Sequence, residues 1–187
     1  MKEILFFGDS LTAGYGLTDP EQTTFPARIS QAIKSAGLSF RVCNAGLSGD
    51  TTVAAFPRLA PLLHDNIALF ILELGANDFL RGHDPEMMYE FLCRMVLQVK
   101  KIAPRAVILL LGIEIPIWVP ATYQQRYAHI YPDLAAAFSL AYISDFMAPI
   151  KGKKQFHLPD GLHPLASGYE LIAEYIWPVT KTILDKS

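Results

Sequence analysis

The most constraining feature of the sequence is an almost continuous apolar run over residues 67–74, interrupted only by Glu73. A short run without polar alternation is typical of a strand buried on both faces, as in a parallel sheet. Residues 4–7 and 106–111 form two similar runs, and segments with helical spacing of their apolar residues lie between the runs. Strands that alternate with helices are joined by right-handed crossovers, which place helices on both faces of the sheet.

The other elements follow from the positions of apolar, capping and helix-breaking residues. We expect strands at 4–8, 40–43, 67–74, 106–111 and 141–143, and helices at 24–36, from 50 or 51 to 63, 87–102, 121–138 and 165–184. A length of 187 residues fits a single domain. We therefore predict one domain, residues 1–187, with a three-layer α/β/α fold and a flavodoxin-like parallel sheet of about five strands.

Four polar stretches interrupt this largely apolar sequence. Three of them follow predicted strands, at residues 8–10, 44–46 and 75–78, and the fourth, 160–163, precedes the last predicted helix. The carboxyl ends of parallel strands meet at one edge of a sheet, where such folds place their ligands. The first three stretches should therefore converge, and the fourth is in a position to close over them.

The side chains of these stretches are complementary for acyl transfer. A serine hydroxyl is a weak nucleophile until a base takes its proton, and histidine is the usual base near neutral pH. His163 can serve Ser10 in this way if Asp160 holds its other ring nitrogen. Donors for a developing oxyanion are available from the N–H of Ser10 and of Gly46 and from the side-chain amide of Asn77. The plainer alternative is a strand and a polar turn, with Ser10 as a helix cap.

Taken together, the four stretches resemble the sequence blocks of the GDSL esterases, also called SGNH hydrolases. The matching blocks are Gly8-Asp9-Ser10-Leu11, Asn44-Ala45-Gly46-Leu47-Ser48-Gly49, Gly75-Ala76-Asn77-Asp78 and Asp160-Gly161-Leu162-His163-Pro164. Within that family the chain is similar to the branch of multifunctional acyl-CoA thioesterase I, lysophospholipase and arylesterase. The resemblance implies a catalytic triad of Ser10, His163 and Asp160, and an oxyanion hole that Gly46 and Asn77 complete with Ser10.

The resemblance also implies a serine esterase that hydrolyses carboxylic esters or thioesters through an acyl-enzyme, with aryl esters, acyl-CoA or lysophospholipid-like molecules as substrates. Two alternatives stay open: a carbohydrate acetyl esterase of the same family, and a non-catalytic flavodoxin-like binding module. The sequence lacks the glycine patterns of dinucleotide-binding folds and P-loops, and it lacks the Gly-x-Ser-x-Gly elbow of α/β-hydrolases. We expect Ile117, Trp118 and Val119 to line the acyl site, with packing in the core as the alternative.

Composition narrows the partners. A net charge of −2 without a basic run disfavours nucleic acid, and no apolar run is long enough to span a membrane. No histidine or cysteine cluster has metal-ligand spacing, so we expect no metal and no cofactor, only a small-molecule ester or thioester, and a monomer. Cys43 and Cys93 suit a reducing compartment, and no signal-peptide pattern opens the sequence. We therefore expect a cytoplasmic protein, or a periplasmic or secreted one if a leader has been removed.

Overall fold

The computed structural model of the chain describes residues 1–114 and 121–187. Its sheet has five parallel strands in the order β2-β1-β3-β4-β5. The strands are β1 (Lys2–Gly8), β2 (Phe40–Gly46), β3 (Ile67–Glu73), β4 (Val107–Leu111) and β5 (Ala141–Ile143). The helices are α1 (Ser10–Ala13), α2 (Pro20–Thr23), α3 (Phe25–Ser35), α4 (Thr52–Leu59), α5 (Ala76–Leu80), α6 (Pro85–Ile102), α7 (Ala121–Tyr127), α8 (Ile130–Phe138) and α9 (Ala166–Leu184), with 3₁₀ turns η1 (Ala60–Leu62) and η2 (Lys154–Phe156).

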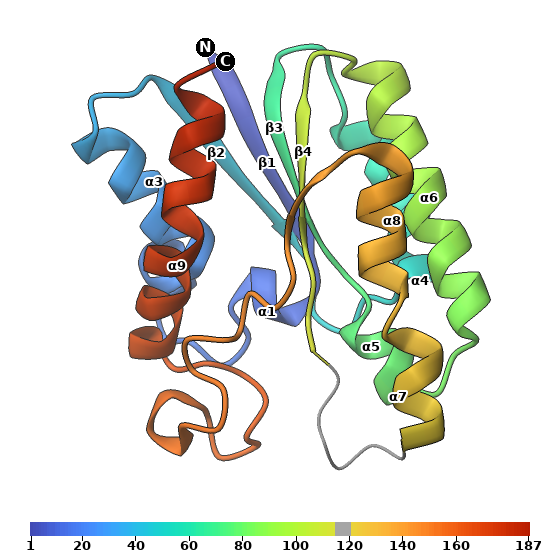
Figure 1. Ribbon diagram of the computed structural model, residues 1–187. Helices are drawn as coiled ribbons and strands as arrows, with labels where there is room; N and C mark the ends of the chain where they lie inside the picture. The colour runs from blue at the N-terminus through green and yellow to red at the C-terminus, as the bar shows by residue number, and fades with distance from the viewer. Residues whose placement is uncertain (115–120) are drawn as a thin grey trace.

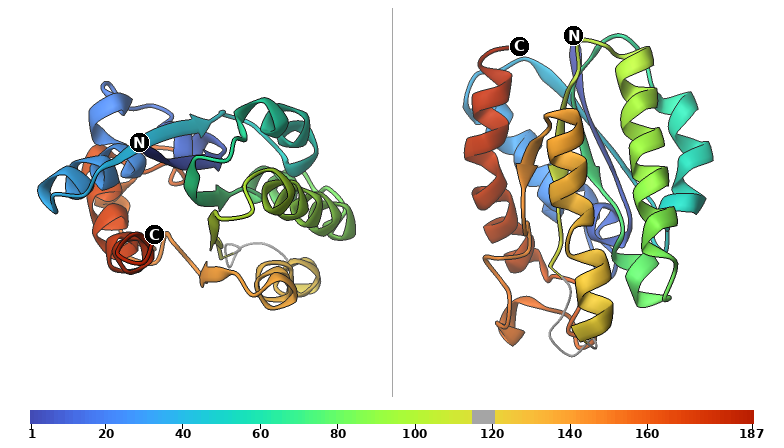
Figure 2. Two further views of the ribbon diagram at one scale, coloured as in Figure 1. Left: turned by 90° about the horizontal axis from the view of Figure 1, so that it is seen from above. Right: turned by 45° about the vertical axis from the view of Figure 1, so that its right-hand side comes forward.

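Helices cover both faces of the sheet because successive strand residues point to opposite sides. Leu5 and Phe7 of β1 join a core cluster with residues of α4, α6 and α8. Ile4 and Phe6 join a second cluster, which packs against α3 and α9. Figure 1 shows these two helical layers on either side of the strands, and Figure 2 shows them from above. The predicted three-layer α/β/α fold with a parallel sheet is confirmed.

Strand β2 is longer than predicted. We expected it to end at Cys43 and to be followed by a loop, but it continues to Gly46, which pairs with Gly8 of β1. The side chain of Asn44 also donates a hydrogen bond to the Thr12 carbonyl at 2.9 Å. Residues 44–46 are therefore part of the sheet, and their polar composition reflects contacts with the segment that follows β1.

The predicted helix at 121–138 is two helices, α7 and α8, separated at residues 128–129. Pro132 explains the break, because a proline ring clashes with the carbonyl four residues earlier and supplies no N–H for it. That carbonyl belongs to Ala128, the residue that follows the end of α7. The helix predicted to reach residue 63 likewise ends at Leu59 and passes into η1.

The carboxyl ends of the strands lie at one end of the molecule. Figure 1 shows α1 and α5 at this lower end, whereas both chain termini lie at the opposite end. The turn after β3 depends on Gly75, whose φ of +127° disfavours any side chain and whose Cβ would lie 2.1 Å from Met88 Cε. Across the described ranges, no helix has the length and apolar character needed to cross a bilayer.

Candidate active site

Ser10 is the first residue of α1, and a single residue, Asp9, separates it from the end of β1. The helix is capped by Asp9, whose Oδ1 accepts a hydrogen bond from Leu11 N at 3.0 Å. The alternative role of Ser10 as the cap is therefore wrong, and its hydroxyl is left for another partner. The first N–H groups of a helix have no intrahelical acceptor, so the Ser10 N–H is also available to a ligand.

The partner of the Ser10 hydroxyl is His163, 153 residues further along the chain. His163 Nε2 lies 2.9 Å from Ser10 Oγ, and His163 Nδ1 lies 2.7 Å from Asp160 Oδ2. The three side chains thus form one continuous hydrogen-bonded chain. The His163 side chain is only 13% exposed, whereas that of Asp160 is 40% exposed. The imidazole, which would accept the serine proton, is therefore better shielded from solvent than the carboxylate.

A tight turn before α9 holds Asp160 and His163 together. Asp160 Oδ1 accepts hydrogen bonds from Leu162 N at 2.9 Å and from His163 N at 3.0 Å. Partial burial raises the pKa of Asp160, but hydrogen bonds from the His163 backbone and side chain and from Leu162 N outweigh it and lower that pKa to about 2. Asp160 is therefore ionised at neutral pH and faces the ring nitrogen of His163 as an anion.

The candidate oxyanion donors gather at the ends of β1, β2 and β3. Gly46 N is 3.0 Å from Asn44 Oδ1, to which it donates. The Asn77 amide donates to Asp9 Oδ2 at 3.1 Å and to the Asp50 carbonyl at 2.9 Å. The Gly46 N–H and the Asn77 amide therefore both donate to acceptors within the protein, and an oxyanion would have to share or replace these hydrogen bonds. Such a change on substrate binding is common, because catalytic hydrogen bonds often tighten only in the complex.

Comparison with known proteins agrees with the resemblance that the four polar sequence blocks indicate. The family model described as "GDSL-like Lipase/Acylhydrolase family" matches residues 6–171. The chain belongs to this family. It is 33% identical over 182 residues to "Esterase TesA" of Pseudomonas aeruginosa, with 97% of this chain and 89% of that protein covered.

Two further relatives agree with the GDSL-family assignment. "Thioesterase 1/protease 1/lysophospholipase L1" of Escherichia coli K12 is 33% identical over 174 residues, covering 92% of this chain and 80% of that protein. The solved structure "Crystal Structure of TesA" superposes with a TM-score of 0.90 at 31% identity, covering 97% of this chain and 99% of that one. The predicted resemblance to the family is thus confirmed.

The GDSL-family site contains a buried carboxyl pair, of which the sequence predicts only a structural role for Asp9 and no role for Glu73. Asp9 is fully buried and Glu73 is 1% exposed. Glu73 Oε2 accepts from the Thr12 hydroxyl at 2.6 Å and lies 3.4 Å from Asp9 N. Burial, reinforced by the charges of Asp50 and Asp78, raises the pKa of Asp9 to about 7 despite its hydrogen bonds. The signal was present in the sequence, because Glu73 alone interrupts the apolar run at 67–74.

Tyr15 is a second residue that sequence reasoning did not single out. Its ring lies against that of His163, with centroids 4.6 Å apart and planes at 44°. The tyrosine is 53% exposed, so it covers one face of the histidine from the solvent side. No motif marks this position, because the contact joins residues 148 positions apart only through the fold.

An open depression of about 380 Å³ lies beside β2, bounded by Ala13, Thr24, Val42 and Gly46 among others, and it meets the site at Gly46. Within residues 1–114 and 121–187, no group of three or more His, Cys, Asp or Glu side chains is arranged to hold a metal ion. The predicted acyl-site residues Ile117, Trp118 and Val119 lie outside the described residues.

Proposed function

We propose that this protein is a serine esterase that hydrolyses carboxylic esters or thioesters through an acyl-enzyme intermediate. The observation that carries the proposal is the hydrogen-bonded chain from Ser10 Oγ through the His163 ring to Asp160, at 2.9 and 2.7 Å. A serine becomes a competent nucleophile when a base accepts its proton and a third group orients that base. The same chain would have little purpose in a binding module.

In this proposal Ser10 Oγ attacks the carbonyl carbon while His163 Nε2 takes the hydroxyl proton. Asp160 fixes the tautomer with the proton on Nδ1 and stabilises the imidazolium that forms. The carbonyl π electrons move to oxygen, and the N–H groups of Ser10 and Gly46 and the side-chain amide of Asn77 donate hydrogen bonds to the resulting oxyanion. His163 then protonates the leaving alcohol or thiol. In the second half of the reaction His163 takes a proton from a water molecule that attacks the acyl-enzyme, and it returns this proton to Ser10 Oγ as the acid is released.

The names of the relatives, which include "Arylesterase" of Vibrio mimicus, support aryl esters, acyl thioesters and lysophospholipid-like molecules as the substrate class. We propose Ile117, Trp118 and Val119 as part of the acyl site, because apolar residues at the carboxyl edge of the sheet suit an acyl chain. A carbohydrate acetyl esterase is the second candidate within the family. We also propose that residues 1–187 form one catalytic domain active as a monomer, since Ser10, His163 and Asp160 come from one chain.

The deciding experiment measures kcat/KM for p-nitrophenyl esters and CoA thioesters from acetyl to palmitoyl, beside an acetylated sugar. Ser10→Ala serves as the control, and a fluorophosphonate probe reports the nucleophile by intact-protein mass. We expect the probe to label the wild type once and Ser10→Ala not at all, and longer acyl chains to be preferred to acetyl. Labelling that persists in Ser10→Ala would contradict the nucleophile, and preference for the sugar acetate would select the second candidate.

A further inference from the structure

Arg58 lies in α4, and its guanidinium reaches the ends of two strands that carry site residues. Nη2 donates to the Gly8 carbonyl at 2.9 Å, and Nη1 donates to the Ala45 carbonyl at 2.6 Å. Gly8 is two residues before Ser10, and Ala45 directly precedes Gly46. One planar side chain therefore binds the peptide group that carries the Gly46 N–H and the peptide group one residue before that of the Ser10 N–H.

The same side chain also reaches the segment that anchors the third donor. Arg58 Nε lies 2.5 Å from Asp50 Oδ2, and the carbonyl of Asp50 accepts the hydrogen bond from the Asn77 amide at 2.9 Å. The guanidinium thus connects with all three donors, twice through a preceding carbonyl and once through Asp50. The three donor nitrogens of Arg58 belong to one planar guanidinium and point in different directions. This arrangement needs the rigid donor fork of arginine, which the single ammonium of lysine cannot replace.

The surroundings of Arg58 hold the guanidinium in place. Its carbon Cζ lies 4.1 Å from the centre of the Phe7 ring, and the side chain is only 22% exposed. The helix that carries Arg58 is itself bound to α5, because the buried Asp78 carboxylate accepts from Thr52 N at 2.9 Å and from Thr52 Oγ1 at 2.8 Å. A charged group held this firmly sets the positions of the carbonyls it binds.

We propose that Arg58 is the positioning residue of the oxyanion hole, which fixes the separation of the strand ends that present Ser10, Gly46 and Asn77. The proposal rests on the proposed function, because it assumes that these donors receive an oxyanion. Arg58 touches no reacting atom and acts through the carbonyls of Gly8 and Ala45 and the carboxylate of Asp50. Its loss should therefore weaken transition-state binding much more than substrate binding.

The principal variant is Arg58→Lys, which keeps the charge but not the fork. With p-nitrophenyl butyrate we expect kcat to fall about 10- to 100-fold and KM to change less than about threefold, because small misplacements of catalytic donors have effects of this size. An aryl trifluoromethyl ketone provides the specific readout, since addition of Ser10 Oγ to its carbonyl places an alkoxide in the hole and a proton on His163. Its inhibition constant should rise by the same factor as kcat falls, whereas that of the matched methyl ketone should not.

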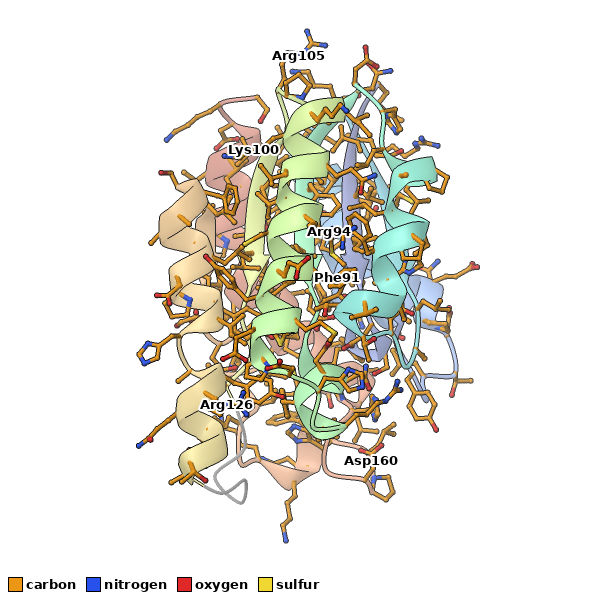
Figure 3. All side chains as sticks on the ribbon, turned by 90° about the vertical axis from the view of Figure 1, so that its right-hand side faces the viewer. Phe91, Arg94, Lys100, Arg105, Arg126 and Asp160 are labelled. Carbon is orange, nitrogen blue, oxygen red and sulfur yellow. The ribbon has the colours of Figure 1, made fainter. Side chains whose placement is uncertain are left out.

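Arg94→Met is the matched control. Arg94 also stacks on aromatic rings, at 4.3 Å from the Phe56 centroid and 4.5 Å from that of Phe91, but it lies on α6. Figure 3 shows Arg94 beside Phe91 on the outer surface, away from the end of the molecule where Asp160 lies. Its loss removes a comparable cation–π contact and should leave both kcat and the trifluoromethyl ketone constant within about twofold.

Asp50→Asn decides the matter if Arg58→Lys does not fold, because it keeps the oxygen acceptor and removes only the charge on the arginine's partner. We expect kcat to fall about three- to tenfold, since the acceptor of the guanidinium changes from an ionised carboxylate to a neutral amide oxygen, with the trifluoromethyl ketone constant rising in proportion. Unchanged kcat in folded Arg58→Lys or Asp50→Asn overturns the proposal. A lower kcat with unchanged trifluoromethyl ketone affinity also overturns it, since it indicates a general structural role. If the wild type neither hydrolyses esters nor reacts with the fluorophosphonate probe, the proposed function itself fails.

Discussion

At the scale of single residues, Asp160 offers the clearest separation of catalysis from stability. Its side chain is 40% exposed and its carboxylate faces His163. Asp160→Asn removes the charge that stabilises the imidazolium and favours the wrong tautomer, so kcat should fall by a factor on the order of 10³–10⁴. The melting temperature should change little. A loss of less than tenfold, measured on the preferred ester of the series, would remove Asp160 from the proposed triad.

Gly46 is predicted to tolerate no side chain. A Cβ at this position would lie 2.3 Å from Ala13 N and 2.8 Å from Ala13 Cα. The end of β2 and α1 would have to separate, which displaces a proposed oxyanion donor. We expect Gly46→Ala to lower kcat about 10²- to 10³-fold, the range for losing one such donor.

The control for Gly46→Ala is Gly37→Ala, in the turn between α3 and β2. Gly37 has a φ of +69° and open space around its missing side chain, so its replacement strains the backbone without a clash. It should lower the melting temperature and leave kcat unchanged. Equal kcat values for the two variants would show that close packing at Gly46 does not matter for activity.

The proposed triad could be predicted from the sequence, whereas its support could not. Ser10, Asp160 and His163 each lie in a short block with its own chemistry, and the structure brings them within hydrogen-bonding distance. Arg58 gave no signal, because it binds carbonyl groups that any sequence would supply. Tyr15 gave none either, since its contact with His163 exists only in the folded chain.

At the scale of elements, α4 carries Arg58, which binds the ends of β1 and β2. The stability of this helix depends on the cap of its first turn. Thr51 caps this helix, with its side-chain oxygen 3.3 Å from Ala54 N. Thr51→Ala should destabilise the protein by about 1 kcal/mol, which corresponds to a fall of about 2–4 °C in melting temperature for a chain of this size. Thr51→Ser keeps the oxygen and should lose much less. Similar losses for both variants, measured by thermal unfolding, would indicate packing of the threonine methyl group instead of capping.

The sequence predicts some element boundaries correctly, but not the boundaries that depend on contacts with another part of the fold. The strand at 141–143 and the end of the last helix at 184 agree with the structure. The sequence predicts an end of β2 at Cys43, three residues too early, because the pairing of Gly46 with Gly8 is a long-range interaction. The break between α7 and α8 was missed although Pro132 was visible, since a proline in a first turn also fits a helix start.

At the scale of the whole molecule, parallel strands and two helical layers follow from the alternation of apolar runs and helical segments. The strand order β2-β1-β3-β4-β5 does not follow from this alternation. It depends on which connections place the next strand on one side of β1 and which on the other. This order puts β1 and β3 beside each other at the centre and so brings Asp9 and Glu73 together in the interior. Two carboxyl groups in one buried place make the stability of the molecule depend on pH.

The direction of that dependence follows from the pKa values. Burial raises the pKa of Asp9 from 3.8 to about 7, and burial together with the charge of Asp9 raises that of Glu73 well above its usual value. Both groups therefore hold their protons more tightly in the folded chain than in the unfolded one. Their contribution to stability is complete below about pH 4, where both states are protonated. It is lost as pH rises through the folded-state values, so the free energy of unfolding should fall between about pH 5 and 8.

Glu73→Gln tests this dependence, because the amide resembles the protonated carboxyl and keeps an oxygen for Thr12 and Asp9 N. Between pH 5 and 8 the free energy of unfolding of the wild type should fall relative to that of Glu73→Gln, because only the wild type carries at this position a buried carboxyl group whose pKa is raised in the folded chain. Urea unfolding at several pH values measures the difference. Glu90→Gln is the control, because Glu90 is a 66% exposed carboxylate on the same protein and should give a curve parallel to the wild type. A parallel curve for Glu73→Gln would mean that Glu73 ionises as easily in the folded chain as in the unfolded one, and the buried carboxyl pair would then not hold the proton assigned to it.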